Sequence, residues 1–470
     1  MSEYVKFIKD KLDKSADVKY REIHIGCGIV HVVFIDDLCD SKFISEYIVS
    51  PITINRNFIF SMDNIKLQVL EANSVGDIKD FNSALMHLMS GDVLIILEGS
   101  NEVIYCEAKG FNKRSITTPL TETVIKGPRE GFNESFSDNV SLIRRKIKNP
   151  DLKLENFTLG KKSNTIVVMM YIENVAQTDL VERIRNKLKD MQLEFILDIN
   201  YIEEQFKEKG TFFDTIGYSE KPDIVASKIL EGRVAIIVDG TPFVITMPYF
   251  FIENFQMADD YYINKHYSNA ARILREVSFL VSLLLPGLYI AITTYHFSLI
   301  PSVFVFRLAV SRAGVPFPTV IEIYLMMFFF QILREAGVRL PQPVGQAMSI
   351  VGALILGDAA VGAGLTSQIS IIVVALSSIC SFLVPKLYPV ISIWSPLIIL
   401  FGSLLGLPGF YIIMLTFVAH VASLESVGYS YLYPMGTTKK FKFRDVLFRG
   451  NLKDISKNIG EDESNEKDKA

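Results

Sequence analysis

The feature that most constrains this 470-residue chain is an abrupt loss of charged side chains after about Arg275. The stretch from Glu276 to Ser423 holds nine charged residues, whereas the first 250 residues carry charges throughout. Within it, Val277 to Thr294 is eighteen residues without a charge, which is long enough for a helix to cross a bilayer. The mean hydropathy of +0.29 fits a chain that is only partly apolar. The sequence therefore predicts an integral membrane protein with a soluble first half.

Further uncharged stretches are candidate membrane helices. They cover 323–333, 340–357, 359–385 and 387–423. Four to six spans are expected, since 389–423 can cross once or twice. Lys265, Arg272 and Arg275 precede the first span, and further basic residues follow the last. By the positive-inside rule both ends are therefore cytoplasmic and the number of spans is even. A short apolar run with two arginines, Phe304 to Val315, is expected at the membrane surface.

The soluble half contains an internal repeat. Gly91–Ser100 aligns with Gly232–Thr241, and each has an apolar run, an acidic-Gly turn and then a second apolar run, which is typical of a β-hairpin. Upstream, 32–47 and 167–184 each have a strand pattern followed at once by an amphipathic helix pattern. The predicted fold class is an α+β membrane protein, in which a duplicated soluble α/β N-terminal domain precedes an all-α transmembrane helical bundle.

These patterns also predict the domain boundaries. The expected parts are a first α/β lobe at 1–125, a helical linker at 126–158, a second α/β lobe at 159–262, a transmembrane domain at 263–435 and a cytoplasmic, partly disordered tail at 436–470. In the linker, Arg144 and Arg145 belong to a basic run at helical spacing. A solvated helix face is the favoured interpretation, and contact with anionic lipid or an acidic partner is the alternative.

Composition argues against several classes of function. With a net charge of −4 and a pI near 6.0, the chain lacks the basic surface that nucleic acid requires. The four cysteines show no CxxC spacing and the histidines are dispersed, so no metal site is expected. No Walker loop, dinucleotide loop or nucleophile with a partnered base is present, so neither catalytic residues nor a cofactor are expected. The N-terminus has no secretory signal pattern, which favours a reducing, cytoplasmic setting for the first half.

Charged side chains inside the apolar half are candidates for function, because a charge in hydrocarbon is costly. The pore or gating candidates are Glu322, Asp358, Arg334, Glu335 and Arg339. Asp358 is the sharpest of these because its neighbours are so apolar, although burial against Arg334 or Arg339 is as compatible with the sequence as a pore-lining role. Small residues on the same predicted helix form a stripe that would permit close packing with a helix of the same chain or of another copy. They are Ala353, Gly357, Ala360 and Gly364.

A set of short motifs follows one order along the chain. They are Gly127-Pro128, Asp239-Gly-Thr-Pro242-Phe, Leu285-Pro286-Gly-Leu-Tyr289, Arg334-Glu-Ala-Gly-Val-Arg-Leu-Pro341 and Ser349-Ile-Val-Gly352-Ala-Leu-Ile-Leu-Gly357. Together they resemble the A subunits of bacterial spore germination receptors, over nearly the whole chain after residue 30. Departures exist: Gln331 stands where the family pattern has an acidic residue, and Asp358 and Gly362 stand where it often has Gln and an acid.

The resemblance implies a nutrient-sensing receptor in the inner membrane of the spore, assembled with a transporter-like B subunit and a lipoprotein C subunit. It also implies that A subunits oligomerise and form a pathway for monovalent cations through the lipid bilayer. Two alternatives stay open: a secondary transporter, because the apolar segment is broken near Gly406 to Gly409, and a non-conducting scaffold for the partner subunits. The duplicated lobes resemble small-molecule binding folds, and an assembly and gating scaffold is the alternative.

Overall fold

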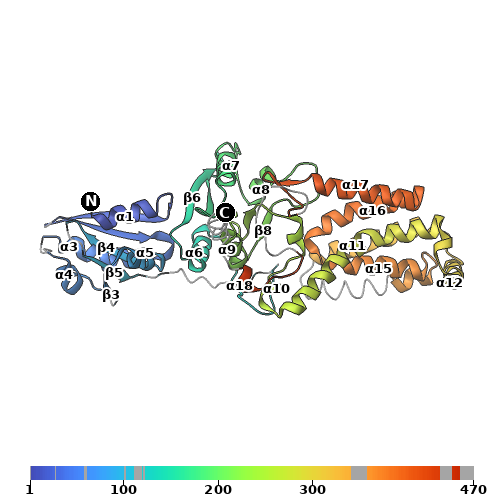
Figure 1. Ribbon diagram of the computed structural model, residues 1–470, viewed down its shortest axis with the longest axis horizontal. Coiled ribbons are helices and arrows are strands. Elements are labelled where there is room, and N and C mark those ends of the chain that lie inside the picture. Colours follow the sequence, from blue (N-terminus) through green and yellow to red (C-terminus); the bar gives the residue numbers. More distant parts are fainter. Residues whose placement is uncertain are drawn as a thin grey trace, which may run out of the picture.

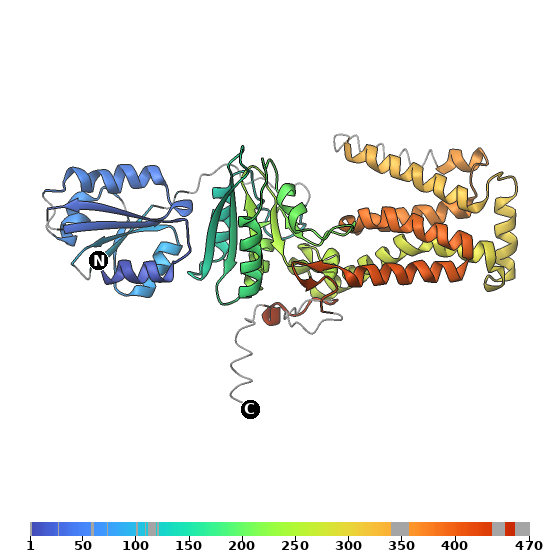
Figure 2. The ribbon, with the colours of Figure 1, turned by 90° about the horizontal axis from the view of Figure 1, so that it is seen from above.

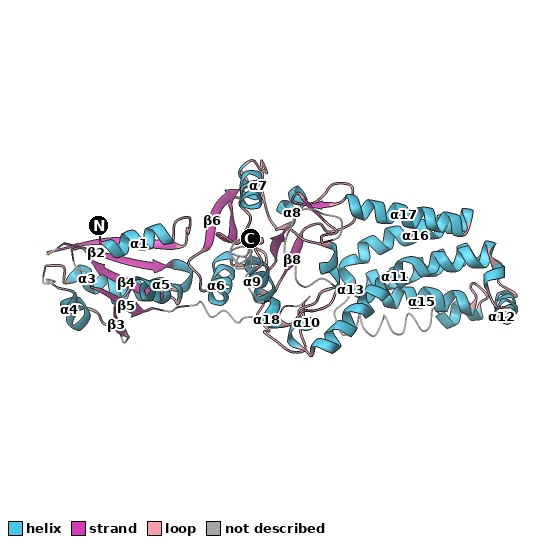
Figure 3. Ribbon diagram, viewed as in Figure 1, coloured by secondary structure: helices cyan, strands magenta, loops and turns pink. Residues whose placement is uncertain are grey.

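The computed structural model describes residues 2–26, 28–57, 61–72, 74–99, 102–108, 110, 119, 122–339, 357–434 and 447–455. Across these residues, two α/β lobes and a helical bundle follow one another along the long axis of an elongated molecule (Figures 1 and 2). The two large sheets lie in the two lobes, and long helices fill the part of the molecule farthest from the first lobe (Figure 3). A two-stranded sheet of β11 (Glu425–Ser426) and β12 (Tyr429–Ser430) follows the last long helix. The predicted fold class, a duplicated soluble α/β domain followed by an all-α transmembrane bundle, is confirmed.

The first lobe is a five-stranded antiparallel sheet in the order β1-β2-β4-β5-β3. Its strands are β1 Val18–Ile25, β2 Gly28–Ile35, β3 Val75–Ile78, β4 Asp92–Leu97 and β5 Val103–Glu107. One face packs on α1 (Glu3–Lys11) and α5 (Phe81–Met89). The other face packs on short helical segments, which are η2 Ile44–Val49, α3 Ser50–Ile54, α4 Met62–Asn64 and η3 Ile65–Val69. Because β4 is covered on both faces, all of its residues are buried.

The second lobe repeats this sheet strand for strand, in the order β6-β7-β9-β10-β8. Its strands are β6 Leu152–Leu159, β7 Thr165–Ile172, β8 Gly217–Ser219, β9 Val234–Val238 and β10 Val244–Met247. Its helices are α6 Phe136–Lys146, α7 Thr178–Lys189, α8 Asn200–Phe206 and α9 Pro222–Leu230. The two predicted hairpins are β4–β5 and β9–β10. The duplication expected from the sequence is therefore a duplication of the whole sheet.

The structure places the predicted linker, 126–158, in the second lobe. Helix α6 precedes β6 just as α1 precedes β1, and β6 is an edge strand of the second sheet. Val140 and Ile143 of α6 pack in one core with Val225 and Ile237. The boundary differs from the expected one because the repeat is visible in the sequence only from its second strand onward. Its first helix and first strand carry too few matching residues to be recognised.

The bundle consists of long helices that run along the molecule and one short helix across its far end (Figure 2). The helices are α11 Lys265–Tyr295, α12 Ser302–Arg312, α13 Thr319–Arg339, α15 Gln368–Phe382, α16 Tyr388–Leu405 and α17 Leu407–Ser423. By length and composition, Lys265–Tyr295 and Pro385–Leu405 can each cross a membrane, and α15 and α17 are shorter apolar helices. The short helix is α12, which contains most of the run that the sequence places at the membrane surface. It lies at the end of the bundle farthest from the two lobes (Figure 1). The predicted span at 340–357 lies outside the described residues except for Gly357.

The stretch 387–423 forms two helices rather than one. The chain turns at Gly406, which has a φ of +67°. A Cβ atom there would lie 2.9 Å from His296 and 3.0 Å from Tyr295, so glycine is needed both for the backbone conformation and for the close packing on α11. Helices α16 and α17 then run antiparallel, and the chain returns to the second lobe.

Candidate functional site

Glu322 is the most deeply buried of the predicted pore candidates, with 0% of its surface exposed. It lies in the first turn of α13. Its Oε2 atom accepts hydrogen bonds from the Ser367 backbone N–H at 2.9 Å and from the Thr366 hydroxyl at 3.3 Å. Ser367 is the N-cap of α15, so its backbone N–H is not used inside that helix and is free to hold the carboxylate. The Oε1 atom of Glu322 lies 3.7 Å from Nε of Arg312, at the end of α12.

Asp358 lies in a helical turn at 357–362 and is exposed on the surface of the single chain. Gly357 and Gly362, in the same helical segment, have no described atom within 4 Å of the position that a Cβ would take. Ala360 instead faces inward and packs with Ile290, Ile323 and Met326. The predicted small-residue stripe is thus divided: Ala360 packs within the chain, Gly357 faces open space, and Gly364 ends the helix with a φ of +68°. Ala353 lies outside the described residues.

The structure separates the remaining candidates from Glu322. Arg334 lies on the same helix, twelve residues further on, which corresponds to about 18 Å along the helix axis. Its guanidinium stacks on the Tyr388 ring, 3.2 Å from the centroid, and donates a hydrogen bond to Ser381. Glu335 and Arg339 form an exposed ion pair one helical turn apart. In the described parts of the bundle, neither arginine has an ion pair with Asp358, so the hypothesis of an acid buried against them gains no support.

The second lobe and the bundle share one apolar core. It contains residues of the second sheet, such as Ile236 and Ile245, and bundle residues such as Phe279 and Phe417, without interruption. At the junction, Phe213 of the second lobe lies 6.0 Å from Phe417 between ring centroids, and Phe251 lies 5.9 Å from Phe279. Aromatic side chains bury the largest areas of any residue type, so this contact holds the lobe rigidly on the bundle.

Buried ion pairs reinforce the same junction. Asp260, in α10 (Asp259–Tyr262), pairs with Arg272 at 2.9 Å and with Arg275 at 2.5 Å, and both arginines belong to the first turns of α11. Arg275 also donates to the Phe255 carbonyl oxygen at 2.6 Å. Two of the basic residues expected to flank the first span, Arg272 and Arg275, are therefore buried and tie α11 to the end of the second lobe.

A second buried carboxylate, Glu253, lies beside this junction. It pairs with Arg233 at 2.6 Å and with Lys228 at 3.2 Å, and it accepts the Phe250 backbone N–H at 2.8 Å. Burial raises the pKa of Glu253, but the charges of Arg233 and Lys228 together hold it below its ordinary value. Glu253 is therefore ionised at neutral pH and fixes the chain just before α10.

The first and second lobes meet through polar contacts. Arg144, one of the two predicted linker arginines, is 1% exposed and forms a bidentate pair with Asp17, with both N–O distances at 2.8 Å. Ser137 donates to the Asp37 carboxylate and Ser141 to the Asp37 carbonyl oxygen, each at 2.6 Å. The prediction that Arg144 lies on a solvated helix face is therefore wrong, because its guanidinium neutralises a buried carboxylate of the first lobe. Arg145 does lie partly exposed, 3.9 Å from Glu130.

These buried arginines are what sequence reasoning missed. Arg144, Arg233 and Arg272 are the three largest side chains with less than 2% exposure in the described chain. Arg144 stood out only as part of a basic run and Arg233 had no distinguishing local pattern, while Asp17 lies 127 positions from Arg144. The sequence did mark Arg272, but as one of a cluster of basic residues before a span.

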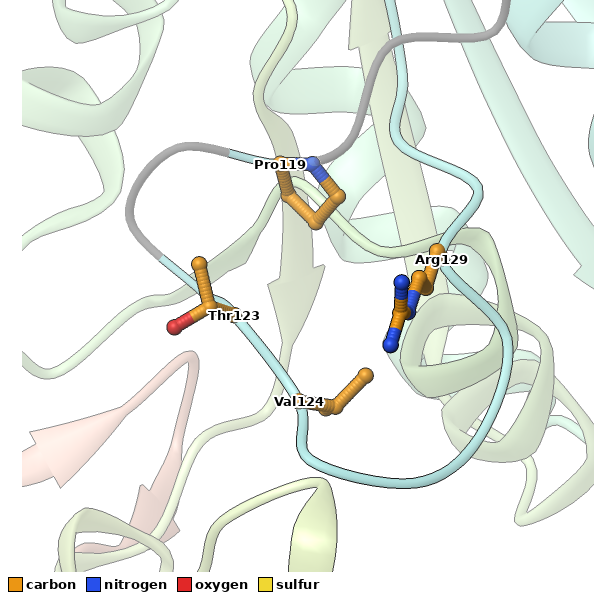
Figure 4. Close-up of a pocket in the computed structure, with 4 residues that line it drawn as sticks. All are labelled: Pro119, Thr123, Val124 and Arg129. Carbon is orange, nitrogen blue, oxygen red and sulfur yellow. The ribbon is translucent and has the colours of Figure 1, made fainter.

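A small cavity of about 200 Å³ lies inside the bend of residues 119–129, which connects the lobes. Figure 4 shows its lining, with the guanidinium of Arg129 facing Val124 across the space. Pro119 and Thr123 complete the described lining. The cavity belongs to the connection rather than to either sheet. Among the residues that the structure places, no group of three or more His, Cys, Asp or Glu is arranged to hold a metal ion.

The fold and the buried charges define the class: a membrane protein whose duplicated α/β domain is joined by ion pairs and an apolar core to a helical bundle. The chain belongs to the Bacillus/Clostridium GerA spore germination protein family, whose profile matches residues 6–459.

Similar proteins cover most of the chain. Spore germination protein KA of Bacillus subtilis (strain 168) is 38% identical over 94% of this chain and 82% of its own length. The uncharacterized membrane protein YfkQ of the same organism is 35% identical over 92% of this chain and 86% of its own length. Spore germination protein GerLA of Bacillus cereus is 31% identical over 92% of this chain and 89% of its own length.

The chain is also similar to a solved structure, the crystal structure of the N-terminal domain of the A subunit of the Bacillus megaterium spore germinant receptor GerK3. It is 31% identical, with a TM-score of 0.39, and the match covers 53% of this chain and 94% of that one.

Proposed function

We propose that this protein is the A subunit of a nutrient-sensing spore germination receptor, and that several copies together form a pathway for monovalent cations in the inner membrane of the spore. Family membership supports the receptor assignment, and a B subunit and a C subunit are the partners that it implies. The proposed pathway lies between copies and is lined by Asp358, with Glu322 acting from inside each subunit.

The exposure of Asp358 is the observation that carries this proposal. In the described bundle Asp358 has no hydrogen bond or ion pair, and the neighbouring Gly357 and Gly362 face open space. A carboxylate cannot remain ionised against lipid, so beyond the contacts of the described residues it needs water or a further polar group. A second copy packed on Gly357 and Gly362 would supply a wall close enough to frame a wet path, and a ring of acids would favour cations.

The course of the chain supports a cytoplasmic position for the lobes and the C-terminal segment. After α17, Ser426 and Tyr431 return to the second lobe, where Ser426 accepts the Tyr249 backbone N–H at 2.9 Å and Tyr431 accepts a hydrogen bond from Asn254 at 3.0 Å. Both ends of the bundle region therefore lie on the same side. The basic residues that flank this side then face the cytoplasm.

The test is cation release from spores that carry Asp358→Asn. The loss of charge should slow release and germination after nutrient addition, with an unchanged amount of receptor in the spore membrane. Gly357→Leu should lower the amount of assembled receptor instead, because a large side chain would fill the contact between copies. Asp190→Asn, an exposed acid at the end of α7, is the matched control. Parental release by Asp358→Asn spores would show that Asp358 lines no pathway, which would leave a transporter or a non-conducting scaffold.

A further inference from the structure

Glu322 is incompletely satisfied inside the bundle. Its Oε2 atom accepts two hydrogen bonds, but its buried Oε1 atom accepts none from the described residues. The Nε atom of Arg312 is also buried without a hydrogen-bond partner in this part of the chain. These two atoms face one another at 3.7 Å, which is longer than a hydrogen bond, so Arg312 neutralises the carboxylate by charge alone. The pair is held less firmly than the pairs of Asp260, which lie at 2.5 and 2.9 Å.

The helix that carries Arg312 is only lightly attached. In α12 only Leu308 is buried, whereas Val303 and Phe306 are each 71% exposed. The helix is followed by Gly314, whose φ of +94° is a backbone conformation that glycine adopts readily and that other residues rarely adopt. A movement of α12 would therefore withdraw Arg312 from Glu322 without disturbing the main core of the bundle.

The surroundings of Glu322 supply oxygen atoms. Thr366 contributes a hydroxyl in contact with Oε2. The buried hydroxyl of Tyr289 interacts with the side chains of Ser367 and Ser370 and lies near Glu322. A carboxylate with hydroxyl oxygens is a ligand set that suits hard cations. In the observed state the only cation that we find at this carboxylate, within the described residues, is the guanidinium of Arg312.

We propose that Arg312 is a tethered cation that occupies the site on Glu322 to which a permeating monovalent cation binds, and that receptor activation withdraws it by moving α12. This inference rests on the proposed function, since it assigns to Arg312 the role of blocking a cation site in the same pathway. In the resting receptor, Arg312 neutralises Glu322 and keeps a mobile cation from binding there. When α12 moves, the unpaired Oε1 atom becomes available to a cation.

A purely structural ion pair gives a different expectation. If the pair only fastened α12 to α13, removing either partner would loosen the same contact and the two variants would behave alike. A tethered cation predicts opposite phenotypes, because Arg312 blocks the site and Glu322 forms it. The comparison of the two single variants therefore separates the two roles.

The experiment measures the release of potassium from spores before and after nutrient addition. Arg312→Gln should raise release before nutrient by about tenfold, the effect of a modest shift between closed and open states. Arg312→Lys should stay near the parental rate, since it keeps the charge. Glu322→Gln should not raise release before nutrient and should slow it afterwards, and the double variant Arg312→Gln with Glu322→Gln should behave like Glu322→Gln.

Receptor abundance in the spore membrane is measured for every variant. If Arg312→Gln does not accumulate, Arg312→Met, which keeps a long apolar side chain, provides the second test. Equal release from Arg312→Gln and Glu322→Gln spores would overturn the proposal in favour of a structural pair, and so would parental release from Arg312→Gln spores. If Asp358→Asn slows release in that same experiment, the pathway itself stands. If none of the variants changes release, both proposals fall.

Discussion

The two α/β lobes have the same strand order but are used differently. The second lobe shares a continuous apolar core with α11, α16 and α17, and its end is fixed by the buried pairs of Asp260. The first lobe has two cores of its own, and in the described structure neither contains a residue of the second lobe. It is attached through Arg144, Asp37 and their polar partners. The second lobe is thus fixed to the bundle by a shared core, whereas the first lobe folds separately and is joined to the second by polar contacts.

Removing the residues after 250 should reveal the largest difference in stability between the two lobes. The fragment 1–250 loses Phe251, Phe279 and Phe417 from the second lobe's core and nothing from the cores of the first lobe. Each lost large side chain is worth roughly 1.5–3 kcal/mol, so the second lobe should unfold well before the first. Calorimetry of fragments 1–110 and 1–250 measures this. A single transition shared by both lobes would contradict the comparison.

Asp260→Ala should give the next largest effect. It would leave Arg272 and Arg275 buried without their carboxylate, which typically costs about 3–5 kcal/mol. The full-length protein should lose thermal stability in detergent and accumulate poorly in the membrane. Glu335→Ala is the control, since its pair with Arg339 is exposed and worth less than about 1 kcal/mol. Equal stability of the two variants would show that Asp260 does not fasten the lobe to the bundle.

Arg144→Ala should loosen the first lobe without unfolding the second. Asp17, at 4% exposure, would lose its bidentate partner, at a cost of roughly 3 kcal/mol. Limited proteolysis should then cut between the lobes. An apolar pair, Arg144→Met with Asp17→Leu, should restore much of the resistance because no buried charge is left unpaired. Lys14→Ala, which removes an exposed pair with Glu173, serves as the control. If the Lys14→Ala and Arg144→Ala variants were cleaved between the lobes at the same rate, Arg144 would have no special role in this contact.

The contact between the lobes should also depend on pH through Asp37. Burial raises the pKa of Asp37 to about 6, and nearby Asp17 and Asp36 add to the rise, against the hydrogen bond from Ser137 and the charge of Arg144. The unfolded chain has the ordinary value near 3.8. Between about pH 4 and 6 the folded protein therefore binds a proton that the unfolded one has lost, and stability falls as pH rises through this window.

Asp37→Asn should remove that pH dependence and stabilise the fragment 1–250 at pH 7 by about 1–3 kcal/mol, the equivalent of the two-unit shift or less. Urea unfolding at pH 5 and pH 7 measures the change. Asp36→Asn, an exposed neighbour, should change stability by less than about 0.5 kcal/mol. A lower stability of Asp37→Asn at pH 7 would mean that the ionised carboxylate holds the lobes together.

Most of the fold could be predicted from the sequence because its signals are local. The hairpins at Gly91–Ser100 and Gly232–Thr241 combine β-branched runs with acidic-Gly turns, and most of α11 is the uncharged apolar segment Val277 to Thr294. The first helix and strand of each copy could not be recognised as a repeat. Their positions in the second copy follow the core that α6 makes with α9, which is a tertiary contact.

The site was only partly predictable. Glu322 stood out as an acid in apolar sequence, and the structure buries it completely. Its neighbour Arg312 was recognised only as a charge at the membrane surface, because their contact depends on the turn through Gly314 between α12 and α13. The pairs of Arg144 and Arg233 join residues whose partners no local pattern identifies.

Cross-linking of copies through position 358 tests the central claim most directly. In full-length protein whose four native cysteines are changed to alanine, Asp358→Cys should form disulfide-linked dimers in membranes, because copies are proposed to meet there. Leu415→Cys is the control, since it is 63% exposed on α17, which Figure 2 shows on the side of the bundle away from α13. Dimers from Asp358→Cys and none from Leu415→Cys is the predicted result. Dimers from Leu415→Cys alone, with none from Asp358→Cys, would contradict a pathway between copies at Asp358.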